Sequence, residues 1–150
     1  MSAVAAMVEF LTARIAAGQT LAGIKAVYQV AGFEAKSALY PHLLIGEAPE
    51  TERPNVGNAR RLVSATLQVI CQVNAGKRGD DVVAAEARAW RTKLRAALAE
   101  SPRLVTTTYT TGFAVSVRAT SGEVYLAVVG DTRVGSAEEA VTILYSELAA

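Results

Sequence analysis

The feature that most constrains the fold is a long run of alternating residues between Arg60 and Asn74. In its central part Leu67, Val69, Cys71 and Val73 alternate with Thr66, Gln68, Ile70 and Gln72. Successive side chains of a β-strand point to opposite faces, so this pattern predicts a half-buried strand with one face on the core. The strand is longer than a small sheet needs, and we expect it to project beyond its own domain.

Two segments have the apolar spacing of amphipathic helices. The first runs from Ser2 to Ala17, and Gly18 ends it. Its apolar face is Val4, Met7, Val8, Leu11 and Ile15. The second begins at Asp80 or Asp81, either of which can cap it, and runs to about Glu100 before Ser101-Pro102. Its apolar stripe is Val83, Ala87, Trp90, Leu94 and Leu98, which makes Trp90 a core residue.

The remaining segments favour β-structure. Alternation predicts a strand over Ile24–Val30, and Pro41 leads a second one over Tyr40–Gly46. The Thr-rich stretch Leu104–Thr111, the alternating residues from 113 to 118 and the segment Glu123–Gly130 continue the pattern. A turn at Ser121-Gly122 predicts a hairpin between the last two of these segments.

The last segment, residues 136–148, carries two opposing signals. Ser136 with Glu139 three residues later is a capping box, which favours a helix. The β-branched and aromatic run Val141–Tyr145 favours a strand, and we expect the strand. The chain of 150 residues is therefore predicted to form a single α+β domain over 1–150, with a mixed or antiparallel sheet and helices packed on one face.

An acidic stretch with many turn-forming residues separates the predicted second strand from the long one. Residues 47–59 contain prolines, asparagines and a glycine, together with Glu47, Glu50 and Glu52. This composition indicates an extended loop. The loop is either a solvated connector or a binding arm, since long loops in small domains are often functional.

Charge and cysteine content exclude several classes. Fifteen basic against fourteen acidic residues give a net charge of +1, whereas proteins that live on nucleic acid or anionic membranes carry a basic excess. The longest apolar runs are too short to span a bilayer, and the N-terminus does not have the pattern of a signal peptide. A single cysteine, Cys71, excludes an internal disulfide and favours the cytoplasm.

A search for chemistry finds no catalytic, metal-binding or cofactor-binding constellation. His42 is the single histidine, too few for a zinc site or a convincing triad, and we interpret it as structural or surface. No nucleotide-binding glycine motif occurs, and the Gly76–Gly79 turn lacks the partners of a phosphate loop. The pairs Asp80-Asp81 and Glu138-Glu139 are interpreted as helix-start residues. We therefore expect neither enzyme activity nor a cofactor.

One basic stripe is a candidate interface. Arg88, Arg91 and Arg95 lie at helical spacing beside the apolar stripe of the second helix. Such a stripe is either a solvated face or a contact with an acidic partner, and the acidic loop of residues 47–52 in another copy fits. A contact between unlike surfaces is heterologous, the kind that closes rings.

The order of the predicted elements resembles the tail-terminator (tail-completion) proteins of long-tailed bacteriophages. The elements that carry the resemblance are an N-terminal helix, a strand containing Val27-Tyr28, a short proline-led strand at residues 40–47, a polar loop, the long strand Arg60–Asn74, the helix Asp81–Ala99 and a closing segment Val134–Leu148. The segment Leu104–Gly130 is longer than the family pattern requires. The resemblance covers nearly the whole chain but contains no diagnostic motif.

The resemblance implies a structural virion protein of the tail or neck, assembled in the host cytoplasm. Such proteins form a homohexameric ring that caps the head-proximal end of the tail tube, stops tube polymerisation and offers a surface to the head-completion protein. DNA passes through the channel without being read. Two alternatives remain: another neck connector or tube subunit, and a small-molecule or regulatory binding module with a pocket between sheet and helix.

Overall fold

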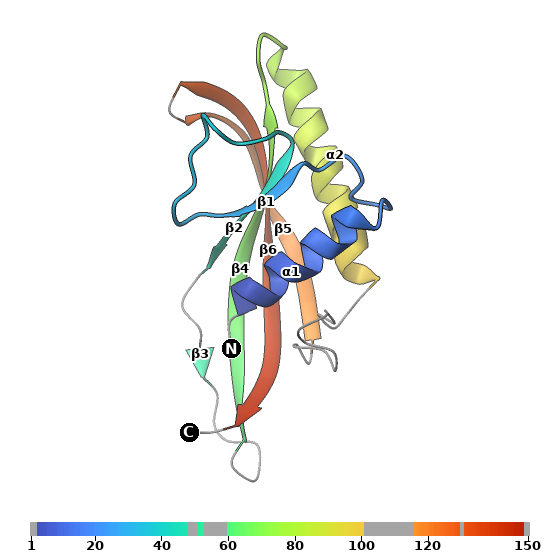
Figure 1. The fold of residues 1–150 in the computed structure, drawn as a ribbon, viewed down its shortest axis with the longest axis vertical. Helices are drawn as coiled ribbons and strands as arrows, with labels where there is room; N and C mark the ends of the chain where they lie inside the picture. The colour runs from blue at the N-terminus through green and yellow to red at the C-terminus, as the bar shows by residue number, and fades with distance from the viewer. Residues whose placement is uncertain (1–2, 48–50, 53–59, 101–115, 130, 149–150) are drawn as a thin grey trace.

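The computed structural model describes residues 3–47, 51–52, 60–100, 116–129 and 131–148, with the backbone alone at 47, 51–52, 60–63, 116–122, 129 and 145–148. It contains two helices and six strands (Figure 1). In chain order these are α1 (Ala3–Ala16), β1 (Ala26–Gln29), β2 (His42–Glu47), β3 (Thr51–Glu52), β4 (Arg60–Asn74), α2 (Asp80–Ala99), β5 (Ser116–Val129) and β6 (Thr132–Leu148). The fold is α+β with a mixed sheet, as the sequence predicts.

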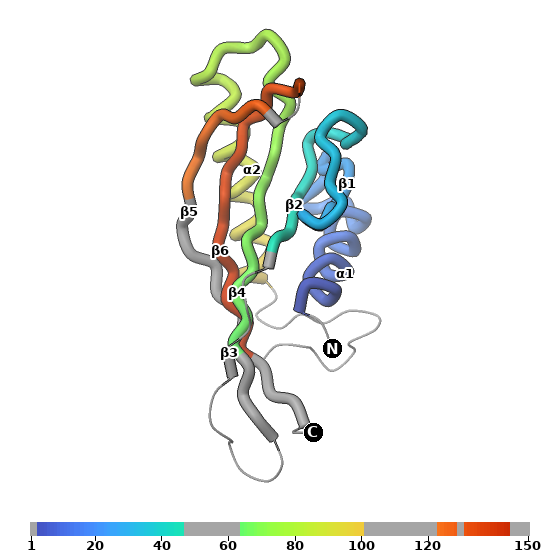
Figure 2. The backbone as a smooth tube through the Cα atoms, turned by 90° about the vertical axis from the view of Figure 1, so that its left-hand side faces the viewer, coloured from blue at the N-terminus to red at the C-terminus, as the bar shows by residue number. Residues whose placement is uncertain are grey.

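The strands form one sheet in the order β1-β2-β4-β6-β5, which Figure 2 shows from the side. β1 pairs with β2 in parallel, and every other pairing is antiparallel. The centre is the β4–β6 ladder, in which Arg60 opposes Leu148 at one end and Asn74 opposes Val134 at the other. β3 adds two residues beside β4, at Ser64 and Val63.

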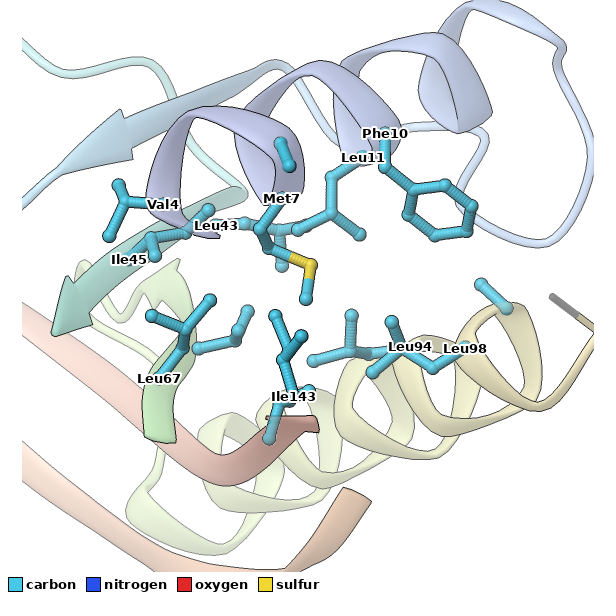
Figure 3. Packing of buried hydrophobic residues seen from close by; sticks show 14 of the residues in the cluster. Val4, Met7, Phe10, Leu11, Leu43, Ile45, Leu67, Leu94, Leu98 and Ile143 are labelled. Atoms are coloured by element: carbon cyan, nitrogen blue, oxygen red, sulfur yellow. The ribbon is translucent and has the colours of Figure 1, made fainter. Parts of the chain in front are cut away.

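Both helices pack on the same face of the sheet and share one core with it (Figure 3). Met7 and Leu11 of α1 and Leu94 of α2 are fully buried, and they meet Leu67 of β4 and Ile143 of β6. Burying side chains of this size contributes about 1.5–3 kcal/mol each before entropy is counted, so this layer supplies most of the stabilisation. Trp90 is half-buried and packs against buried residues of the core, which confirms its structural role.

Gly18 ends α1 as expected. Its φ of +70° lies in the left-handed region, where a side chain is strained, and its N–H donates to the Ile15 carbonyl. The start of α2 differs from the prediction. Its N-cap is Gly79, without a side-chain cap, and Asp80 and Asp81 are its first-turn residues. The two carboxylates still suit the positive end of the helix dipole.

The C-terminal strands correct one prediction and confirm another. No turn occurs at Ser121-Gly122, because β5 runs through these residues and only its register shifts, between Ser121 and Val124. The hairpin is instead formed by β5 and β6, which meet between Val129 and Thr132. Turn-forming residues here mark a β-bulge, which inserts extra residues without reversing the chain.

Residues 132–148 form a strand rather than a helix. β6 lies between β4 and β5 and pairs with both, so its backbone is hydrogen-bonded on two sides. That tertiary pairing outweighs the local capping-box signal of Ser136 and Glu139. The interpretation of Glu138-Glu139 as a helix start is therefore wrong. In a strand the two carboxylates point to opposite faces of the sheet.

The predicted loop at residues 47–59 is partly strand. Glu47 is the last residue of β2, and Thr51 and Glu52 form β3 against β4. Residues 48–50 and 53–59 lie outside the described part of the chain, as does the predicted strand Leu104–Thr111. The strands Ile24–Val30 and Tyr40–Gly46 are confirmed with shifted bounds, as β1 and β2.

α2 packs tightly against the sheet at Gly135 of β6. A Cβ added there would lie 2.4 Å from Cγ1 of Val83 and 3.2 Å from Cγ2 of Val73. Val83 belongs to the first turn of α2, so the missing side chain allows the helix to reach the sheet. Glycine is required here for space rather than for backbone conformation.

We expect Gly135→Ala to lower the free energy of unfolding by about 1–3 kcal/mol, the usual cost of overpacking a core. Chemical denaturation monitored by Trp90 fluorescence measures it. Val83→Ala, which removes the contacting methyl groups, is destabilising alone through its cavity. The double variant should lose less than the sum of the two single variants. Additive losses would contradict the proposed contact.

Candidate functional site

The face of the sheet opposite the helices, here called the open face, is largely uncharged. On β4 it presents Ser64, Thr66, Gln68, Ile70, Gln72 and Asn74, which alternate with the core residues. On β6 it presents Val134, Ser136, Glu138, Ala140, Thr142 and Leu144. Among these described side chains Glu138 is the single charge. A face of this kind offers little affinity for phosphates, which comes from lysine and arginine.

The β4–β6 ladder extends beyond the helices at one end (Figure 1). β4 has 15 residues, and at about 3.3 Å per residue it spans roughly 50 Å. α2 has 20 residues, and at 1.5 Å per residue it spans about 30 Å. The end formed by residues 60–64 and 144–148, here called the ladder end, therefore has no helical layer over it in the described structure. β4 thus extends beyond the helical layer but not beyond the sheet, because β6 pairs with it over its whole length.

The two edges of the sheet are unlike. β1 is an edge of four residues that pairs in parallel, whereas β5 is an edge of 14 residues that pairs antiparallel. Within the described residues no strand pairs with the outer side of β5. An unpaired edge of this length is a template for pairing with another chain.

A row of polar side chains crosses the open face. His42 opposes Gln72, Gln72 opposes Ser136, and Ser136 opposes Tyr125, so β2, β4, β6 and β5 each contribute one residue. His42 Nε2 lies 2.8 Å from Gln72 Oε1, and Gln72 Nε2 donates to Ser136 Oγ over 3.2 Å. Tyr125 Oη donates to Glu138 Oε1 over 2.9 Å. We call these four residues the polar row.

Aromatic rings enclose His42, which is fully buried. Tyr28 lies edge-on at 5.1 Å between ring centroids, Phe33 at 5.2 Å and Tyr40 at 4.6 Å. Burial lowers the pKa of His42, and its hydrogen bonds to Gln72 and to the Leu39 carbonyl partly oppose that shift. The sequence left open whether His42 is a structural or a surface residue, and its burial shows that it is structural.

The predicted basic stripe is divided between two environments. Arg88 is exposed on α2. Arg95 turns toward the sheet, where its Nε lies 2.7 Å from Oε2 of Glu139, a fully buried side chain. Arg91 is half-buried, and its charge acts on Cys71 of β4. Of the three arginines in the predicted stripe, Arg88 is therefore the one in a plainly exposed position.

The acidic half of the predicted interface is described less fully. The backbone of Glu47 ends β2, and that of Glu52 belongs to β3 beside the ladder end. Glu50 lies outside the described residues. Both described positions are on the β2 side of the sheet, whereas α2 packs against β4, β5 and β6. Within one chain the acidic residues and the arginines of α2 therefore lie at different parts of the molecule. A contact between them in two neighbouring copies stays a hypothesis.

Glu139 is the buried charge that the sequence interpretation missed. Its Oε2 accepts from Arg95, while its Oε1 is buried without a hydrogen-bond partner. The alternation of residues in β6 indicates this burial, because Glu139 shares a face with the core residues Ala137, Val141 and Ile143. A carboxylate in that phase must find a cation, and Arg95 faces it across the helix–sheet interface.

An open groove of about 590 Å³ lies where β1 ends beside β2. Val30, Gly46, Gln68 and Ala140 are among its lining residues, none of which is charged. Val4 of α1 and Ile45 of β2 also line it, so the groove touches both a helix and the sheet. No group of three or more metal-ligating side chains occurs within the described ranges, and no helix among them is long and apolar enough to cross a membrane.

The Arg95–Glu139 pair generates a stability prediction. Arg95→Met keeps the aliphatic contacts but leaves a buried carboxylate unpaired, so we expect a loss of about 1–3 kcal/mol. This loss of stability is smaller than the loss expected for a fully buried ion pair, because the Arg95 side chain is 38% exposed. Arg88→Met on the same helix is the matched control and should change stability by less than about 0.5 kcal/mol. Equal losses in urea titrations of the two variants would contradict this role of Glu139.

Cys71 generates a second prediction. Burial, and then the nearby charge of Glu139, raises the pKa of its thiol to about 12, with Arg91 acting in the opposite direction. The thiolate is the reactive form, so the native thiol should be inert at pH 8. As Cys71 is the single cysteine, a colorimetric thiol reagent reports on it alone. Labelling should require denaturant, and rapid labelling of the native chain would overturn the prediction.

Comparison with known proteins adds no family assignment. The chain matches no protein-family model. A search of curated proteins likewise finds no match.

Proposed function

We propose that the chain is a structural subunit of a bacteriophage tail, a tail terminator that forms a closed ring on the head-proximal end of the tail tube. The observation that carries the proposal is the β4–β6 ladder, which continues beyond both helices (Figure 1). A strand pair without a covering layer buries little of its own surface. Such a ladder end is well suited to be completed by a neighbouring subunit.

The unlike edges of the sheet support a ring. One edge of the sheet is the short parallel strand β1, and the other is the long antiparallel strand β5. A contact between two unlike surfaces of neighbouring subunits is heterologous, which means that it runs head to tail. Head-to-tail contacts close into rings when the rotation permits, and otherwise give filaments. The long outer side of β5 is the natural place for such a contact.

The open face supports a channel that lets DNA pass. From Ser64 to Asn74 of β4 and from Val134 to Leu144 of β6, the open-face side chains include no lysine or arginine, so this part of the face gains little from displacing counterions on phosphates. In this proposal the partners are further copies of the chain, the tail tube protein and the head-completion protein. The proposed location is the tail or neck of the virion.

A neck connector or a stacking tube subunit is the nearest alternative, and the assembly state separates it from a terminator. We expect native mass spectrometry and negative-stain images of the purified chain to show a closed ring of about six subunits. Unlimited stacks would replace the terminator with a tube subunit. A tight dimer at every concentration would contradict both, and would favour a binding module that uses the groove beside β2.

A chain that is monomeric in solution is tested further with purified tail tubes. The proposal expects tube ends to bind the chain and to stop growing. Free elongation of tubes at saturating chain concentrations would overturn it. Fixed tube length with bound chain at one end would support the terminator role even without a free ring.

The surface charge of α2 gives a separate prediction. If Arg88 meets the acidic stretch of a neighbouring copy, Arg88→Glu should raise the dissociation constant of the assembly about tenfold, or about 1.4 kcal/mol. Arg88 is preferable to Arg91, whose half-buried charge acts on Cys71 inside the fold. Lys36→Glu, an exposed change of the same charge away from α2, is the control. Equal assembly of both variants in sedimentation experiments would remove Arg88 from the interface.

A further inference from the structure

The donors of the polar row all point in one direction. The Gln72 amide donates to Ser136 Oγ, and Tyr125 donates to Glu138. Between them Ser136 opposes Tyr125, and hydrogen bonding from its hydroxyl acts to lower the pKa of the Tyr125 phenol. At the other end His42 Nε2 faces Gln72 Oε1 at 2.8 Å. The row is therefore a continuous chain of hydrogen bonds from an imidazole to a carboxylate, across four strands.

Both ring nitrogens of His42 face an oxygen atom. His42 Nδ1 lies 2.8 Å from the Leu39 carbonyl, which only accepts hydrogen bonds, so Nδ1 carries a proton. With the Gln72 amide in this orientation, Oε1 also only accepts, and in that case Nε2 carries a proton too. An imidazole with protons on both nitrogens is the charged form. The complete chain thus holds one proton more than a neutral His42 supplies.

A neutral His42 has a second arrangement. Nδ1 keeps its proton toward Leu39, and Nε2 then accepts from the NH₂ group of a Gln72 amide turned by 180°. Gln72 Oε1 now accepts a hydrogen bond from the Ser136 hydroxyl. Since Tyr125 still donates to Glu138, the contact between Ser136 and Tyr125 is left without a proton. The two arrangements differ by one proton and by the orientation of one amide.

We propose that the polar row is a proton-operated switch, in which uptake of a proton by His42 turns the Gln72 amide and completes the chain to Glu138. The switch joins two separate parts of the molecule. At one end the Leu39 carbonyl belongs to the segment 30–41, where Val30 and Leu39 are more than half exposed. At the other end Tyr125 lies on the edge strand β5. This inference rests on the row and is independent of the proposed function.

The surroundings of His42 set the range in which the switch operates. The titratable side chains that contact its ring are Tyr28 and Tyr40. Tyr125 and Glu138 act from the far end of the row, and the helices pack on the other face. Burial lowers the pKa of His42 below its usual value of about 6.5, so the neutral arrangement holds at neutral pH.

The lowered pKa of His42 makes the stability of the fold depend on pH. The unfolded chain binds this proton more tightly than the folded chain, so His42 contributes stability above about pH 6.5 that is lost as the pH falls toward its folded pKa. Charging His42 therefore loosens the fold while it completes the row.

Because His42 is the single histidine, ¹⁵N-histidine labelling gives one ring to follow by NMR. On the intact chain between pH 8 and 4.5, we expect the neutral ring to be the Nδ1–H tautomer. The Gln72 side-chain NH₂ resonances should shift with the same midpoint as the ring. A neutral Nε2–H tautomer, or a Gln72 amide that does not respond with His42, would overturn the switch.

Removing hydroxyl groups that do not touch the ring tests the chain itself. Tyr125→Phe and Ser136→Ala each weaken the charged arrangement, so each should lower the His42 midpoint by a few tenths of a pH unit. Thr142→Val, a hydroxyl on the same face of β6 but outside the row, should leave the midpoint unchanged. If Ser136→Ala does not fold, Tyr125→Phe and the wild-type Gln72 resonances decide. An unchanged midpoint in Tyr125→Phe would overturn transmission along the row.

Discussion

Everything in this fold is attached to the β4–β6 ladder. It is an unbroken register of 15 pairs from Arg60–Leu148 to Asn74–Val134. β2 and β3 add to one side of it, β5 adds to the other, and both helices cover one of its faces. The residues that it brings together are far apart in sequence, so its formation requires the closure of long loops. Once formed, it fixes the phase of every other strand.

That phase decides where polar groups can be buried. On the helix face, Glu139 is held by Arg95 of α2, which couples the second helix to the sheet. On the opposite face, His42 and Gln72 are buried because each finds a partner in the next strand. A buried polar group without a partner costs about 1–3 kcal/mol, so both arrangements favour this register over a slipped one. A one-residue slip of β6 would turn Ser136 toward the helix face and turn Glu139 away from Arg95.

The sequence predicts the elements whose signal lies within one segment. The period-two alternation of residues 60–74 predicts β4 within its observed bounds, and helical spacing predicts α1 and α2. Prediction fails where local chemistry has two outcomes. Ser121-Gly122 is compatible with a turn or a bulge, and the pairing of β5 with β6 selects the bulge. The cap of α2 falls on Gly79 although two aspartates follow it.

The candidate sites are less predictable, because they are made across strands. The helical spacing of Arg88, Arg91 and Arg95 is visible in the sequence, but the buried carboxylate that Arg95 meets lies 44 residues away. The polar row unites residues from four strands whose opposition depends on the register. His42 alone looks isolated in the sequence. Its partners are defined only when β2, β4, β6 and β5 are placed side by side.

The division between covered and uncovered ladder has a consequence for assembly. The helices stabilise the part of β4 that begins at Ala65, the first of its described residues to enter the core. The ladder end has no such layer of its own, and in the proposed ring a neighbouring subunit would supply it. Binding that completes a partly stabilised element raises the stability of the whole by mass action. In that ring, assembly and final folding of this end would be one process, and a lone subunit would be less stable than one in contact with its neighbours.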